Sequence, residues 1–211
     1  MMQINRGDML AYAESYVAED FYMQQARKNG AEVGAIDPTA AVGNLIKYLI
    51  KSAKSRSVVE IGTGSGVGGL WIFAGLNNDG VLTTIDTERE FSKIAKQIFQ
   101  DAEISPTLYR IITGNLIEVV DKLADNNYDF VVARCSNELP DIVHAAARLL
   151  KVGGIFLIDA VMAGGKVADA TQRDSESIAR RDAIKLIQED KRWNSTLLPI
   201  GAGVLVAHKL M

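Results

Sequence analysis

Apolar and polar residues follow each other along most of the chain in blocks that predict strands separated by helices. Short, almost continuous runs of Val, Ile and Leu are typical of strands buried on both faces of a sheet. The predicted strands are residues 58–61, 81–85, 108–112, 130–133 and 155–158, and the predicted helices between them are 70–76, 88–102, 116–123 and 141–150. This alternation predicts a parallel sheet between two layers of helices.

The first part of the chain predicts a helical cap ahead of the alternating region. Apolar spacing predicts one helix over residues 8–29. Thr39 is placed to cap a second helix that extends to about Ala53. We therefore expect a single domain, with the cap over residues 1–54 and a Rossmann-like core over residues 55–211.

The tail departs from strict alternation. A charged helix is expected over residues 171–190, with Arg180 and Arg181 on a solvent-exposed face. Apolar runs at 195–198 and 204–207 follow it, separated only by a short turn, so these two strands must be antiparallel. The sequence thus predicts an α/β fold whose seven-stranded, mostly parallel sheet ends in an antiparallel C-terminal hairpin, with helices on both faces.

Charge and composition limit the classes of partner. Lys and Arg number 23 and Asp and Glu 26, which gives a net charge of −3, and both signs are spread along the chain. Phosphate binding usually shows as a basic stripe, so no nucleic-acid partner is expected. No apolar run approaches the length of a membrane span, and residues 1–14 lack the apolar core of a signal peptide. We expect a cytoplasmic protein without a membrane partner.

Glycine residues follow the first predicted strand directly. Glycine lets the backbone turn sharply and approach a ligand closely, because it has no Cβ atom. This GxGxG pattern alone would suit NAD, FAD or S-adenosylmethionine, and a tight turn without a ligand is the alternative. The cofactor contacts predicted from this loop are Gly62, Thr63, Gly64, Gly66 and Gly68.

Polar side chains near the ends of the first three strands extend the candidate cofactor site. Glu60 lies two positions before the first glycine, where it is expected to orient the loop. Asp86 follows the second strand, where an acid can accept hydrogen bonds from both ribose hydroxyls of an adenosine, and it can also cap the next helix. Gly114 and Asn115 follow the third strand. Asn115 can contact the adenine edge or cap its helix, and both roles remain open.

These motifs resemble the catechol and caffeoyl-CoA O-methyltransferases, which are class I S-adenosylmethionine-dependent methyltransferases, and in particular their small bacterial members. The similarity extends from about Ile36 onward. It implies the class I methyltransferase fold, S-adenosylmethionine as cofactor, a small and often phenolic acceptor, and a homodimer. Most family members also use a divalent metal to hold two hydroxyls of the acceptor. The matching stretches are residues 58–66, 82–86, 149–154, 164–167 and 197–203.

The positions that hold the metal and the catalytic lysine in this family differ here. The resemblance implies an Asp after the fourth strand, a Lys three residues later, and an Asp-Asn pair after the fifth strand. This chain has Arg134, Asn137, and Asp159 followed by Ala160 at these positions. A guanidinium cannot ligate a cation and repels it, so no metal ligand is assigned and the metal-assisted mechanism is not expected. Arg134, Asn137 and Asp159 are the predicted catalytic residues.

Two interpretations of these substitutions remain. Arg134 can replace the metal by pairing with Asp159 or holding an anionic substrate, while another group takes the proton. In the other interpretation the site is inactive, and the protein binds S-adenosylmethionine or a partner without turnover. We expect the first, an O-methyltransferase that works without the metal. Cys135, the only cysteine, is either an activated thiol or a small buried side chain.

Overall fold

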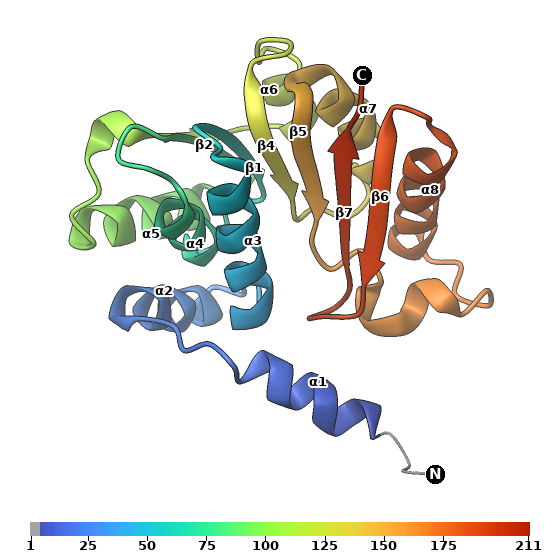
Figure 1. Ribbon diagram of the computed structural model, residues 1–211. Coiled ribbons are helices and arrows are strands. Elements are labelled where there is room, and N and C mark those ends of the chain that lie inside the picture. Colours follow the sequence, from blue (N-terminus) through green and yellow to red (C-terminus); the bar gives the residue numbers. More distant parts are fainter. Residues whose placement is uncertain (1–4) are drawn as a thin grey trace.

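A sheet of seven strands forms the centre of the computed structural model, which describes residues 5–211 (Figure 1). Residues 1–4, which belong to the segment interpreted as lacking a signal peptide, lie outside the described residues. The strand order is β3-β2-β1-β4-β5-β7-β6. The strands are β1 (Ser57–Ile61), β2 (Val81–Asp86), β3 (Tyr109–Thr113), β4 (Tyr128–Ala133), β5 (Leu150–Ile158), β6 (Trp193–Leu198) and β7 (Val204–Lys209).

The first five strands pair in parallel, whereas β7 is antiparallel to both β5 and β6. This confirms the mostly parallel, seven-stranded sheet with its antiparallel C-terminal hairpin. In the parallel register, Ile61 pairs with both Ile85 and Ala133, and Ala133 pairs with Ile158. The residues that follow these strand ends therefore meet at one edge of the sheet.

Helices cover both faces of the sheet, as expected (Figure 1). They are α1 (Arg6–Glu14), α2 (Phe21–Glu32), α3 (Ala40–Ala53), α4 (Val67–Gly75), α5 (Arg89–Asp101), α6 (Leu116–Val120), α7 (Leu139–Leu149) and α8 (Ser175–Glu189), with short 3-10 helices η1 (Pro106–Leu108) and η2 (Ala163–Ala168). Because side chains alternate along a strand, Val58 packs in one core with α3 and α4, and Val59 packs in the other core with α7. Within residues 5–211, no helix has both the length and the apolar composition needed to cross a bilayer.

The single helix expected over residues 8–29 is wrong, because the chain forms two helices there. The first ends at Glu14, and the second begins only after Asp20, whose carboxylate accepts a hydrogen bond from the Met23 amide at 2.9 Å. An N-cap of this kind requires non-helical backbone at the capping residue, which interrupts an otherwise continuous apolar pattern. The Thr39 cap of α3 is confirmed by its hydroxyl oxygen, which accepts from the Val42 amide at 3.4 Å.

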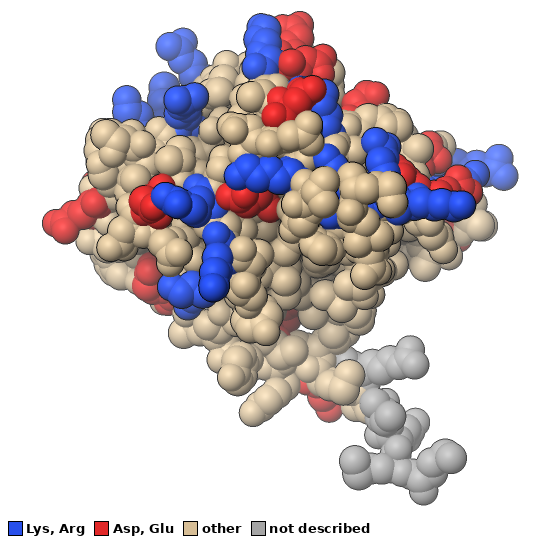
Figure 2. Space-filling view, turned by 45° about the horizontal axis from the view of Figure 1, so that its top comes forward, with Lys and Arg blue, Asp and Glu red and all other residues tan. Residues whose placement is uncertain are grey.

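Basic and acidic side chains lie interspersed on the molecular face shown in Figure 2. Pairs such as Lys151 with Asp129 and Arg192 with Asp190, each at 2.7 Å, join the two signs. The mixing of charges seen along the chain is therefore also present on the folded protein's surface.

Candidate functional site

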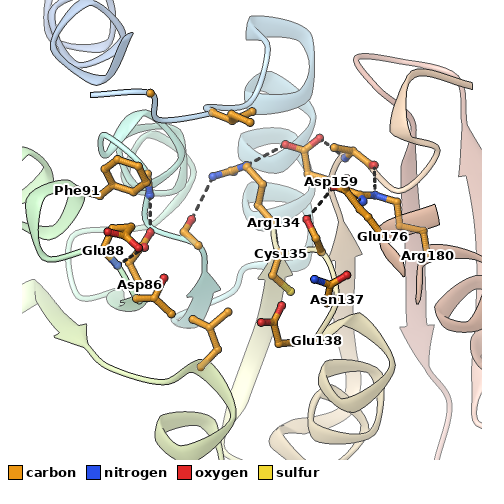
Figure 3. A pocket seen from close by; sticks show the side chains of 18 residues that line it. Asp86, Glu88, Phe91, Arg134, Cys135, Asn137, Glu138, Asp159, Glu176 and Arg180 are labelled. Atoms are coloured by element: carbon orange, nitrogen blue, oxygen red, sulfur yellow. Dashed lines mark hydrogen bonds and ion pairs between the residues drawn. The ribbon is translucent and has the colours of Figure 1, made fainter. Parts of the chain in front are cut away.

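A pocket of about 430 Å³ opens at the sheet edge where the parallel strands end (Figure 3). Gly62 and Gly64 reach it from the turn after β1, and Asp86 from the end of β2. Arg134 reaches it directly after β4, and Asp159 directly after β5. The aligned strand ends therefore bring together residues that lie far apart in the sequence.

The pocket contains only part of the predicted site. The predicted residues that line it are Gly62, Gly64, Asp86, Arg134, Asn137 and Asp159. The predicted residues that do not line it are Glu60, Thr63, Gly66, Gly68, Gly114 and Asn115. Predicted residues that do not line the pocket but contact residues that do can support the pocket wall from behind without forming its surface.

The glycine loop has a backbone that other residues could not adopt without strain. Gly62 has a φ angle of 96°, and a Cβ atom on it would lie 2.4 Å from the carbonyl oxygen of Arg134. Gly64 has a φ angle of 55°, and its Cβ atom would lie 2.7 Å from a carboxylate oxygen of Asp37. Positive φ angles and these close approaches both require glycine, so the loop leaves its backbone open to the pocket.

Asp37 holds the glycine loop from the N-terminal side, and sequence reasoning missed it. Its two carboxylate oxygens accept hydrogen bonds from the amide of Ser65 at 3.0 Å and from the Ser65 hydroxyl at 2.6 Å. Gly34 and Ile36, in the same segment, line the pocket. The sequence showed only a chain break at this segment, because no local pattern connects it to a loop that lies much later in the chain.

Glu60 lies behind the loop and connects to it through two threonines. One carboxylate oxygen accepts from the Thr84 hydroxyl at 2.7 Å, and that hydroxyl lies 2.7 Å from the hydroxyl of Thr63. Burial raises the pKa of Glu60 to about 7, although Arg134 and Thr84 favour its ionised form. A Cβ atom on Gly68 would lie 2.1 Å from the other oxygen of Glu60, so this glycine makes room for the buried acid.

Asp86 supports the loop and faces the pocket at the same time. One of its carboxylate oxygens accepts from the Gly64 amide at 3.0 Å and the other from the Glu88 amide at 2.9 Å. Asp86 is not the N-cap residue of α5, a position that Glu88 occupies. Each carboxylate oxygen has more than one lone pair, so the two contacts leave acceptor capacity toward the pocket.

Asn115 caps α6, because its side-chain oxygen accepts from the Glu118 amide at 3.1 Å. The amide of Gly114 donates to the backbone oxygen of Asp86 at 2.9 Å. Leu116 and Phe91 line the pocket next to these residues. Capping is therefore one role that Asn115 has, and its contact with an adenine edge stays a prediction.

Arg134 lies in the wall of the pocket with its side chain only 7% exposed. Its Nε donates to an Asp159 carboxylate oxygen at 3.0 Å and its Nη1 donates to the backbone oxygen of Gly62 at 3.2 Å. Nη1 also lies 3.9 Å from Glu60. Burial favours loss of the proton, but the charges of Asp159 and Glu60 outweigh it and raise the pKa of Arg134. Arg134 thus joins the ends of β1, β4 and β5 as a permanent cation.

Arg180 is buried at the far end of the pocket, and the expectation that it faces solvent is wrong. It is 6% exposed, its Nε donates to the backbone oxygen of Ala160 at 2.9 Å, and its Nη1 lies 2.5 Å from Glu176. Glu176 also accepts from the hydroxyl of Ser136 at 2.8 Å. Arg181 likewise donates to backbone oxygens of the segment before α8. The spacing of Glu176 and Arg180 on one helix face was the available signal.

Cys135, Asn137 and Glu138 form the remaining wall of the pocket near Arg134 (Figure 3). Burial, together with the charge of Glu138, raises the pKa of Cys135 to about 12, so the thiol stays protonated. This half-buried, protonated thiol fits the interpretation of Cys135 as a small packed side chain and does not fit that of an activated thiol. Asn137 is exposed and free to contact a ligand in the pocket.

The donor set at the strand ends does not fit the divalent metal implied by the resemblance. Asp159 directs one carboxylate oxygen to Arg134 and accepts from the Ala160 amide with the other at 2.7 Å. Within residues 5–211, no group of three or more His, Cys, Asp or Glu side chains is arranged to hold a metal ion. A cation seated beside Asp159 would meet the Arg134 guanidinium, which repels it.

Comparisons of the sequence and of the fold with known proteins both find O-methyltransferases. A family model described as O-methyltransferase matches residues 12–210. A Mycobacterium avium protein that carries an O-methyltransferase name is 41% identical over 200 residues, covering 94% of this chain and 90% of its own length. A solved Corynebacterium glutamicum structure has a TM-score of 0.89 at 31% identity and covers 97% of each chain. The O-methyltransferase TomG of Streptomyces achromogenes, solved in complex with S-adenosylmethionine, has a TM-score of 0.86 at 23% identity over 100% of each chain.

Proposed function

This chain belongs to the O-methyltransferase family, and we propose that it transfers a methyl group from S-adenosylmethionine to an oxygen of a small acceptor without a divalent metal. The observation that supports metal independence is the buried contact between Arg134 and Asp159 at 3.0 Å. This pair places a fixed positive charge where the resemblance implies a metal ion. The acceptor is proposed to be a small molecule, with phenols as the first class to test, because the pocket of about 430 Å³ must hold cofactor and acceptor together.

The cofactor half of the pocket has the features that S-adenosylmethionine requires. Bound there, this cofactor supplies a methyl group already activated by a positively charged sulfur. Asp86 is placed to accept hydrogen bonds from ribose hydroxyls, and the backbone of Gly62 and Gly64 is open to the methionine portion. Phe91 and Leu116 provide an apolar surface for the adenine ring. The solved neighbour TomG holds S-adenosylmethionine, which supports the same cofactor here.

The acceptor half is proposed to work mainly by alignment. Since the methyl group is activated by the cofactor itself, the protein has to bring the acceptor oxygen into line and exclude water. Arg134 and Asp159 fix the wall on which the acceptor lies, and the exposed amide of Asn137 can donate to or accept from an acceptor oxygen. A second copy of this chain is proposed as a partner from family membership alone.

A protein that binds S-adenosylmethionine or a partner without turnover is the second candidate. Its support is that Arg134 and Ala160 replace groups of the metal-assisted family members while the cofactor half keeps its glycine loop and Asp86. The two candidates predict the same cofactor binding and differ only in methyl transfer.

Calorimetric titration with S-adenosylmethionine in EDTA, followed by a screen of phenolic acceptors in EDTA, tests the proposal. Micromolar binding with methyl transfer supports a metal-independent enzyme. Transfer that appears only after Mg²⁺ is added contradicts metal independence. Binding without transfer to any acceptor favours the second candidate, and absence of binding contradicts both.

A further inference from the structure

Methyl transfer to a hydroxyl group releases a proton, and where no metal lowers the hydroxyl pKa a protein group beside the acceptor can accept it. The acidic side chains that line the pocket are Asp86, Glu88, Glu138, Asp159 and Glu176. Their existing hydrogen bonds and ion pairs, together with their positions in the pocket, distinguish one of the five from the other four.

Two of the five are committed at the acceptor end. Asp159 accepts from Arg134 at 3.0 Å and from the Ala160 amide at 2.7 Å, and taking a proton would remove its charge from the buried ion pair with Arg134. Glu176 accepts from Ser136 at 2.8 Å and pairs with Arg180 at 2.5 Å. These contacts lower the pKa of Glu176, which makes it a poor proton acceptor.

Two others lie at the cofactor end. Asp86 accepts from the backbone amides of Gly64 and Glu88, and it is the proposed ribose ligand. Glu88 lies next to Asp86 and Phe91, across the pocket from Asp159 (Figure 3). An acceptor hydroxyl aligned with the sulfur would have to reach past the ribose to contact either one.

Glu138 is the fifth, and its carboxylate has no hydrogen bond or ion pair to the side chains and backbone groups that the structure describes. It is the N-cap residue of α7 and is held in the pocket wall by its backbone, whose oxygen accepts from the Ile142 amide at 3.0 Å. Figure 3 shows its carboxylate beside Cys135 and Asn137. Its charge contributes to the raised pKa of Cys135, the residue that follows Arg134.

We propose that Glu138 is the general base of the methyl transfer, an inference that rests on the proposed function. The acceptor oxygen forms its bond to the methyl carbon while the carbon–sulfur bond breaks and its electron pair returns to sulfur. The hydroxyl proton moves to a carboxylate oxygen of Glu138. The positive charge of the sulfonium and the negative charge of Glu138 are both lost, so the products are a methyl ether, S-adenosylhomocysteine and a neutral carboxyl group.

The partial exposure of Glu138 suits this role. Water reaches the side chain, so the proton can leave after each turnover without crossing the protein interior. A deeply buried base, such as Glu60 behind the glycine loop, has neither access to the pocket nor this route. The hydroxyl proton becomes far more acidic as its oxygen gains the methyl group, so the acceptor need not be ionised beforehand.

The test compares wild type with Glu138→Gln on the best phenolic acceptor of the screen and on its nitro derivative. The nitro group lowers the phenol pKa to near neutrality, so in mildly alkaline buffer most of the derivative is ionised and needs no base. Glu138→Gln is expected to lower kcat about 100-fold on the parent phenol and less than about threefold on the nitro derivative. Glu138→Asp is expected to restore part of the lost activity. Glu32→Gln, at the exposed end of α2, is the matched control.

Calorimetric titration of each variant with S-adenosylmethionine checks that the fold and cofactor site persist, and an affinity within about twofold of wild type is expected. Equal losses on both phenols would assign Glu138 a structural or binding role and overturn the inference. Unchanged activity of Glu138→Gln on the parent phenol would also overturn it, with the proposed function intact. Wild-type protein that binds the cofactor and methylates nothing would instead overturn the proposed function, and this inference with it.

Discussion

The Nε atom of Arg134 lies 3.0 Å from an oxygen of Asp159, and the two side chains are only 7% and 6% exposed. Their backbones belong to the ends of two neighbouring strands, β4 and β5. The contact therefore fixes the pocket wall with a cation that belongs to the protein. Such a cation is present before any ligand arrives and cannot be removed by a chelator.

Replacing Arg134 with Met is expected to lower the free energy of unfolding by about 3–5 kcal/mol, because Asp159 and Glu60 are left buried without their partner. Urea denaturation measures the change. Arg56→Met is the control, since Arg56 and Asp79 form an ion pair with side chains 66% and 57% exposed, and a loss below about 1 kcal/mol is expected there. Equal losses of unfolding free energy in both variants would show that the buried ion pair contributes no more to stability than the exposed one.

Asp86→Ala is expected to weaken S-adenosylmethionine binding by about 1–3 kcal/mol, because the proposed hydrogen bonds to ribose are lost. Calorimetry in EDTA measures the affinity. Asp101→Ala, at the exposed end of α5, controls for removal of a negative charge and should leave the affinity unchanged. An unaltered affinity in the Asp86 variant would remove this residue from the cofactor site.

Gly62→Ala and Gly153→Ala form a matched pair that separates backbone strain from collision. Both glycines have positive φ angles, 96° and 85°, but only a Cβ atom on Gly62 meets another atom, the Arg134 oxygen at 2.4 Å. Gly153→Ala is expected to lose about 1–2 kcal/mol of stability from strain alone. Gly62→Ala should lose about 1–3 kcal/mol more, together with cofactor affinity. Thermal and calorimetric measurements that find the two variants alike would contradict the close approach.

Stability is expected to fall as the pH rises from about 4.5 to about 7, because folding raises the pKa of Glu60 from 4.5 to about 7. In this window the native protein holds a proton that the unfolded chain has released, so the native state loses its advantage as the proton is removed. Urea midpoints between pH 4.5 and pH 8 measure the trend. Glu60→Gln carries no titrating group and should flatten this part of the profile. A slope that persists unchanged in that variant would assign the effect to other residues.

The sheet and its ligand-binding edge could be predicted from the sequence because their signals are local. Mostly apolar runs mark β1, β2 and β4, and residues at or directly after their ends, Asp86 and Gly62 among them, reach the pocket as expected. Parallel pairing brings these strand ends together whatever their separation in the chain. The break between α1 and α2 was missed because the Asp20 cap interrupts a helical pattern without changing its apolar spacing.

The acceptor end could not be predicted to the same extent, because its contacts depend on how distant elements pack. Arg180 looked like one charge among several on a polar helix, and only packing against Ala160 and pairing with Glu176 buries it. Glu138 belongs to no sequence motif. It is the candidate base because the other acidic residues of the pocket are engaged in contacts or lie at the cofactor end, which only the fold reveals. Asp37 is 28 positions from Ser65, beyond the reach of any local pattern.

The contact between Asp37 and Ser65 makes the N-terminal segment part of the support of the glycine loop. A chain that began at residue 55 would keep every strand of the sheet, yet it would lack the carboxylate that holds the Ser65 amide and hydroxyl. The segment before residue 55 therefore contributes to the candidate cofactor site as well as to the core, in which Ile46 and Ile50 of α3 are fully buried. Shortening or recombining this protein with relatives should keep residues 34–38 together with the loop they hold.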